Sequence, residues 1–70
     1  MIDNCCDLLR YMARNLQKAD TFLISPQTIE PTGLDNDTFQ KFIDELAIKG
    51  YIERYMRSVH ITKAGFDYLA

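Results

Sequence analysis

Apolar residues near the start of the chain recur at the spacing of an amphipathic helix. The apolar stripe consists of Cys5, Leu9, Met12 and Leu16. The opposite stripe carries charged side chains, namely Asp7, Arg10, Arg14 and Lys18. The pattern predicts a first helix from about Asp3 to Lys18 that ends near Ala19, with Asp3 or Asn4 as the N-cap that accepts a hydrogen bond from a free amide.

A short apolar run comes next in the chain. The strand formers of Thr21–Ile24 predict a brief strand. Ser25-Pro26 then opens a brief helix, because serine caps a helix and proline is tolerated in its first turn. This helix covers Gln27 to Glu30, barely more than one turn, since Pro31 removes an amide donor and Gly33 frees the backbone.

A second long helix is expected from Asp37 or Thr38 to Lys49. Its apolar face consists of Phe39, Phe42, Ile43, Leu46 and Ala47. Gly50 stands where a helix ends, and acidic residues before Thr38 favour the helix start through the helix dipole.

Beyond Gly50 the hydrophobic period changes from that of a helix to that of strands. Residues 51–55 and 58–62 are rich in β-branched and aromatic side chains and predict two strands joined by a tight turn at Met56-Arg57. Thr62 or Lys63 then opens a short closing helix with Phe66 and Leu69 on one side. One contiguous core is expected from the apolar positions of these elements, namely Leu9, Met12, Leu16, Phe39, Ile43, Leu46, Ile52 and Ile61.

The chain has 70 residues, 47% of them hydrophobic and 26% charged, with a formal net charge of -2. These values predict a single domain over residues 1–70, and they argue against a disordered tail, a membrane span and a polybasic surface. The order of the predicted elements assigns this domain to the α+β class, mostly helical. So short a chain buries little core, and cores of this size are often supplemented by a disulfide, a metal or a partner subunit.

The two cysteines offer neither a disulfide nor a zinc site, so a partner subunit is the remaining way to stabilise so small a core. Cys5 and Cys6 are adjacent and cannot close a loop, and with the single histidine, His60, they do not make a zinc-ligand set. We therefore expect no metal, no cofactor and a homodimer at micromolar concentration, joined by the first and last helices. Free thiols and the lack of an apolar stretch after a basic start indicate a cytoplasmic protein without a signal peptide or membrane partner.

The sequence lacks the combinations of residues that enzyme active sites use. Neither Cys5 nor Cys6 has a context that promises a base and an orienting group, and both are expected in or beside the core. Asp35 and Asp37 begin a calcium-loop spacing that Phe39 interrupts, and no glycine-rich phosphate loop is present. We predict that the chain is not an enzyme.

The stretch from Leu34 to Leu69 resembles the winged helix-turn-helix family, including its small members from phages and mobile elements. The residues that carry the resemblance are Leu34-Asp35-Asn36-Asp37-Thr38-Phe39, Leu46-Ala47-Ile48-Lys49-Gly50-Tyr51-Ile52 and Ile61-Thr62-Lys63-Ala64-Gly65-Phe66-Asp67-Tyr68-Leu69. The resemblance implies a three-helix core with a small antiparallel β-hairpin wing, and double-stranded DNA as the partner of a transcriptional regulator or DNA-binding accessory factor. The chain departs from the family in a second helix cut short by Pro31 and in a minimal wing.

Local charge favours DNA binding in one segment and opposes it in another. Segment 35–49 has four acids against two lysines, whereas segment 53–63 has three cations against one acid, so cations gather on the wing. The candidate DNA contacts are Thr38, Gln40, Lys41, Lys49, Arg54, Arg57 and Lys63. The alternative is a protein-interaction module, in which the acidic third-helix face binds a basic partner or apolar residues assemble a homo-oligomer.

Overall fold

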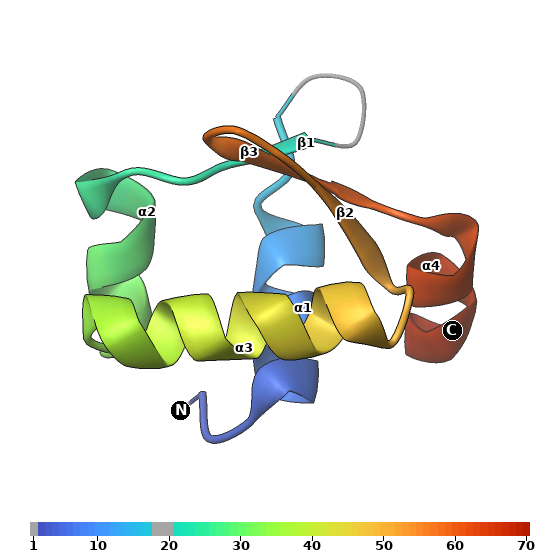
Figure 1. The fold of residues 1–70 in the computed structure, drawn as a ribbon, viewed down its shortest axis with the longest axis horizontal. Coiled ribbons are helices and arrows are strands. Elements are labelled where there is room, and N and C mark those ends of the chain that lie inside the picture. Colours follow the sequence, from blue (N-terminus) through green and yellow to red (C-terminus); the bar gives the residue numbers. More distant parts are fainter. Residues whose placement is uncertain (1, 18–20) are drawn as a thin grey trace.

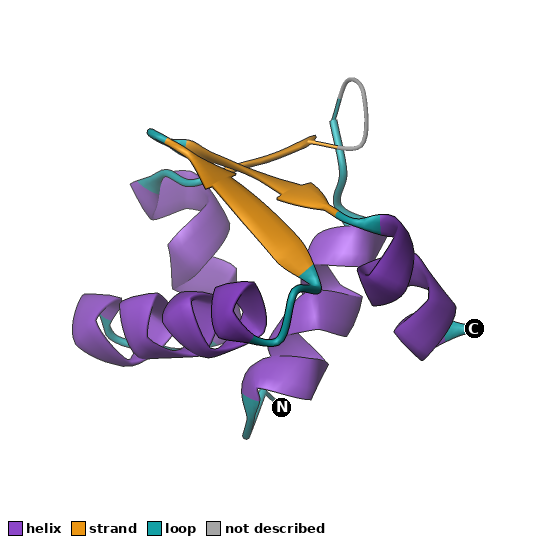
Figure 2. Ribbon diagram, turned by 45° about the vertical axis from the view of Figure 1, so that its right-hand side comes forward, coloured by secondary structure: helices purple, strands orange, loops and turns teal. Residues whose placement is uncertain are grey.

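A computed structural model describes residues 2–17 and 21–70. The helices are α1 (Cys5–Arg14), α2 (Pro26–Ile29), the 3-10 turn η2 (Glu30–Thr32), α3 (Asn36–Ile48) and α4 (Lys63–Leu69), and the strands are β1 (Thr21–Leu23), β2 (Ile52–Tyr55) and β3 (Ser58–Ile61). Helix α1 passes behind α3, and α2 and α4 flank the two ends of α3 (Figure 1). All helices lie on one side of the sheet (Figure 2). The predicted α+β class is confirmed.

Helix α1 is shorter than the sequence pattern predicts. It begins after Asn4, whose side chain accepts a hydrogen bond from the Asp7 amide at 2.9 Å, so the expected N-cap is confirmed. It ends at Arg14, because Asn15 leaves the helical conformation and its side-chain amide donates to the Tyr11 carbonyl at 2.7 Å. The end near Ala19 is therefore wrong; Lys18 and Ala19 themselves lie outside the described residues.

The connection between β1 and α3 contains more helix than expected. Helix α2 begins at Pro26, as proline at a first helical position favours, and η2 continues it for three residues. Pro31 lies inside η2 instead of ending the helical segment, because the early turn of a helix does not need its missing amide. Gly33 ends the segment with a φ of 75°, a conformation that costs glycine little.

Helix α3 begins one or two residues before its predicted start and ends one residue before its predicted end. Asp35 is the N-cap, and its side chain accepts a hydrogen bond from the Thr38 amide at 2.7 Å. The carboxyl end is closed by Gly50, whose φ of 80° lets the Tyr51 amide bond the Leu46 carbonyl at 3.0 Å. The sequence therefore predicted both the extent of α3 and its stop.

The hairpin, residues 52–61, has the predicted turn but belongs to a larger sheet. Strand β3 pairs with β2 and also with β1, both antiparallel, in the order β1-β3-β2. The sheet is therefore three-stranded, where a two-stranded hairpin was expected. Local sequence does not reveal this pairing, because Phe22 and its partner Val59 are 37 residues apart.

The core lies between α1, α3 and the inner face of the sheet. Its buried hydrophobic residues are Cys5, Leu8, Leu9, Met12, Phe22, Phe39, Ile43, Leu46, Ile52, Val59 and Ile61. Every predicted core residue is in this set except Leu16, which is half-buried against it because α1 has already ended. Phe22 and Val59 join the core because β1 pairs with β3.

Helix α4 closes the base of the hairpin, as predicted. The Thr62 side chain caps it by accepting the Gly65 amide at 3.1 Å, and its hydroxyl donates to the Gly50 carbonyl at 2.6 Å. Gly65 packs so closely on the Tyr51 carbonyl that a Cβ there would collide with it. None of the helices in the described part of the chain has the length and apolarity to cross a bilayer.

Candidate interaction faces

The outward side of α3 carries a stripe of mixed character, which we name the α3 stripe. It consists of Asp37, Lys41, Asp44 and Ile48, spaced four, three and four residues apart. All four side chains are exposed, and Ile48 is 86% exposed although it is apolar. Gln40 and Glu45, on either side of the stripe, are half-buried.

Arg54 of β2 reaches back across α3. One nitrogen of its guanidinium donates to Asp44 Oδ1 at 2.6 Å, and another donates to Gln40 Oε1 at 3.0 Å. Strand alternation places Arg54 on the inner face of the sheet, the same face as the buried Ile52, so its side chain is directed at α3, although 39% of it remains exposed. The structure thus brings together two predicted DNA contacts, Gln40 and Arg54, by binding them to each other.

The remaining candidate DNA contacts are dispersed. Lys49 and Lys63 stand next to Gly50 and Thr62, which are hydrogen bonded, so both lysines lie at the base of the hairpin. Arg57 lies in the turn at the opposite end, four strand residues away, about 13 Å along an extended chain. Lys41 is on the α3 stripe.

Thr38 has a structural role in addition to its candidate role in DNA contact. Its amide donates to Asp35, and this hydrogen bond to the charged carboxylate lowers the pKa of Asp35. Its side chain is half-buried.

The tip of the hairpin exposes a side chain that the sequence analysis did not single out. Met56 is 97% exposed and has a φ of 49°, which is unusual for a residue other than glycine. Two-residue hairpin turns require positive φ at their first central position, so the tight turn imposes this conformation. On the outer face of the sheet, Tyr55 makes an edge contact with His60 at a ring distance of 4.9 Å, and His60 Nε2 lies 3.1 Å from Thr21 Oγ1.

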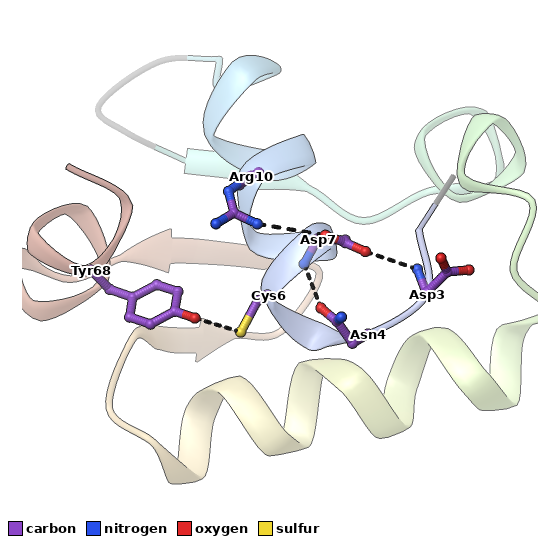
Figure 3. Close-up of polar contacts among 6 residues, drawn as sticks. All are labelled: Asp3, Asn4, Cys6, Asp7, Arg10 and Tyr68. Carbon is purple, nitrogen blue, oxygen red and sulfur yellow. Dashed lines mark hydrogen bonds and ion pairs between the residues drawn. The ribbon is translucent and has the colours of Figure 1, made fainter.

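A second charged stripe follows the outward side of α1, and we name it the α1 stripe. It consists of Asp7, Arg10 and Arg14, spaced three and four residues apart. Arg10 lies 3.5 Å from Asp7 Oδ1, and the other carboxylate oxygen accepts the Asp3 amide at 3.1 Å (Figure 3). All these contacts join residues that are three or four positions apart.

Two surface hollows border the α1 stripe. The first, of about 270 Å³, is lined by Ile2, Asp7, Arg10, Tyr11 and Arg14. The second, of about 230 Å³, is lined by Arg10, Ala13, Arg14 and Leu69. The second hollow is lined by two cations and two apolar side chains, a combination suited to an apolar side chain that is accompanied by a carboxylate.

The cysteines do not add a reactive site to these faces. Burial raises the pKa of the Cys5 thiol, which keeps it protonated. Cys6 is half-buried beside α4, with its Sγ 2.9 Å from the hydroxyl of Tyr68 (Figure 3). The prediction that both cysteines lie in or beside the core is confirmed. The described residues contain no group of three or more potential metal ligands.

Comparisons with protein-family models, with curated proteins and with solved structures find no match to this chain. Function must therefore be argued from the two stripes and the hairpin alone.

Proposed function

We propose that the chain is a winged helix-turn-helix domain that acts as a protein-interaction module, with the α3 stripe as its recognition surface. The order of elements supports the fold assignment: a short helical segment, a glycine turn, a long helix and then a tight hairpin. This is the order that the sequence resemblance implies.

The observation that carries the proposed function is the contact of Arg54 with Asp44 and Gln40. On a DNA-binding surface Arg54 would meet a phosphate and Gln40 a base edge. Here the Arg54 guanidinium donates a hydrogen bond to Gln40 Oε1 at 3.0 Å and another to Asp44 Oδ1 at 2.6 Å. Binding DNA through these groups would first break both hydrogen bonds, whereas a protein partner beside α3 leaves them intact.

The composition of the α3 stripe supports the same conclusion. Its two aspartates outnumber its single lysine, and Arg54 neutralises Asp44, so the stripe offers a phosphate no net positive charge. The exposed side chain of Ile48 gives a protein partner an apolar contact that a phosphate backbone does not offer. A partner that combines cationic and apolar groups fits this surface best.

Two-dimensional NMR on labelled protein tests the proposal with two probes at about 50 mM salt, where charge attraction is weakly screened. A short peptide rich in arginine and leucine should shift the amides of α3 between Asp37 and Ile48. A duplex of mixed sequence should leave them unchanged. The variant Asp37→Asn/Asp44→Asn should weaken the peptide response, and a glutamate-rich peptide of equal length is the matched control. Shifts along α3 with the duplex, and none with the arginine peptide, would overturn the proposal.

DNA binding is the second candidate, favoured by the exposure of Lys41, Lys49, Arg57 and Lys63. With Arg54 engaged by α3, these four candidate cations remain on each protomer, so log affinity should fall with log salt with a slope no steeper than about -3.6. Under this candidate Arg57→Gln should flatten the slope by about 0.9, and Arg54→Gln should leave it unchanged. A fluorescence anisotropy titration at several salt concentrations measures both slopes.

A further inference from the structure

Two charged residues of the α1 stripe and two of the α3 stripe have the same spacing and opposite charges. Asp7 and Arg10 are three residues apart, as are Lys41 and Asp44, with the charges reversed. The next outward position of each helix, four residues on, is Arg14 in α1 and Ile48 in α3. Two parallel helices laid side by side therefore place Asp7 against Lys41 and Arg10 against Asp44, because both repeat every 3.6 residues.

The same alignment accounts for the exposed Ile48. It brings Ile48 to the level of Arg14, where Ala13 and Leu69 form the apolar wall of the second hollow. This side chain is 86% exposed in the single chain, and the hollow gives it an apolar surface to cover.

Asp44 remains available to a second guanidinium although Arg54 already binds it. Arg54 uses Oδ1, a carboxylate has two oxygens, and the Asp44 side chain is 62% exposed. On the other helix, the 3.5 Å separation of Arg10 from Asp7 is longer than a charge-assisted hydrogen bond, so Arg10 exchanges its partner at little cost.

We infer that the partner of the α3 stripe is a second copy of this chain, bound through its α1 stripe and the adjoining hollow. This inference rests on the proposed function, and it names the partner that the proposed function leaves open. A second copy fits the α3 stripe because one chain carries both complementary stripes. Pairing α3 with α3 in antiparallel fashion also joins Lys41 to Asp44, but it sets Ile48 against Asp37 and leaves the hollow empty.

The contact is heterologous, since two different surfaces meet. Helices α1 and α3 face the core with their buried sides, so both outward stripes point away from it, and α1 passes behind α3 (Figure 1). Each copy thus keeps one stripe free, and association continues into a short chain or a ring. One helix against one helix is a small contact, in the class below about 1,200 Å² that is typical of transient association.

Sedimentation velocity on the full chain tests the inference between about 20 μM and about 1 mM protein. The average mass of the wild type should rise with concentration and fall as salt increases from about 50 to about 500 mM, because the paired charges are exposed. Arg10→Gln/Arg14→Gln, which lacks a functional α1 stripe, should be monomeric. Asp44→Asn/Ile48→Ser, which lacks a functional α3 stripe, should be monomeric as well.

A mixture of the two double variants gives the decisive result. The first variant keeps its α3 stripe and the second keeps its α1 stripe, so together they should form a one-to-one dimer and nothing larger. The matched controls Arg57→Gln and Glu53→Gln remove one charge each outside both stripes and should associate like the wild type. Circular dichroism verifies folding; if a double variant is unfolded, Arg14→Gln and Ile48→Ser alone replace the pair with the same expectation.

Three results would overturn the inference: a wild type that stays monomeric at all concentrations, an Arg10→Gln/Arg14→Gln variant that associates like the wild type, or a mixture that stays monomeric. Arg10→Gln/Arg14→Gln keeps its α3 stripe intact. Titrating this variant with the arginine peptide shows whether only self-association is wrong or the proposed function is wrong as well. If α3 still responds to the arginine peptide, only the identity of the partner is wrong. If α3 responds to duplex DNA instead, the proposed function is wrong.

Discussion

The outward stripes of α1 and α3 are held by contacts of different range. On α1, the side chain of Asp7 contacts Arg10 and the Asp3 amide, all within four residues. On α3, Asp44 and Gln40 are bound by Arg54, which follows them by 10 and 14 residues and comes from another element. The α1 stripe therefore exists wherever α1 is helical, whereas the charge of the α3 stripe depends on how the hairpin packs.

This difference shows why net charge alone is a weak guide to the partner. The sequence places Arg54 among the cations of the wing, and the fold moves its charge onto α3, where it neutralises an aspartate. A surface that looks like a cationic wing beside an acidic helix becomes a nearly neutral face around Ile48. Within residues 2–17 and 21–70, the α1 stripe forms no ion pair with another element and keeps two arginines against one aspartate.

The largest expected effect contrasts the two sides of α3 itself. Leu46→Ala should lower the free energy of unfolding by about 2–5 kcal/mol, because Leu46 is completely buried and its loss leaves a cavity. Ile48→Ala, two residues away, should change it by less than about 0.5 kcal/mol, because Ile48 is exposed in the single chain. Urea unfolding at low protein concentration measures both. Equal losses would show that the inward and outward sides of α3 are wrongly assigned.

A smaller effect separates long-range from local ion pairs. Arg54→Gln should lower the free energy of unfolding by up to about 1 kcal/mol, because Arg54 joins β2 to α3 through two hydrogen bonds. Arg10→Gln should cost less than about 0.5 kcal/mol, as expected for a pair within one exposed helix. A double-mutant cycle with Asp44→Asn gives the coupling energy of Arg54 with Asp44. A coupling of zero would mean that Arg54 is free to meet a phosphate.

The smallest effect concerns pH, because α3 has a titratable cap and α1 does not. The amide of Thr38 lowers the pKa of Asp35, so the stabilisation is present above the ordinary pKa of an aspartate and is lost as the pH falls through the lower, folded-state pKa. The melting temperature of Asp35→Asn should therefore fall less between about pH 5 and about pH 2 than that of the wild type. Asn4→Asp should give α1 the same acid sensitivity. If Asp35→Asn is as acid-sensitive as the wild type, the cap does not contribute.

The sequence by itself determined the helices and their limits where local chemistry decides them. The bounds of α3 follow from apolar spacing, the Asp35 cap and Gly50, and the turn at Met56-Arg57 follows from the strands on either side. The predicted α1 is too long, because the apolar pattern continues to Leu16 while the Asn15 side chain already hydrogen bonds the last turn of the helix. Apolar spacing shows which face of a helix would be buried, but not where the helix stops.

Only the tertiary structure decided the third strand of the sheet and the partner of Arg54. The pairing of Phe22 with Val59 and the bond from Arg54 to Gln40 each join distant parts of the chain, and no short-range pattern in the sequence encodes them. Both arise because burying the apolar side of the sheet against α1 and α3 fixes which polar groups face each other. The sequence supplied the charges of this protein, and the packing of its core determined which of them remain free to bind.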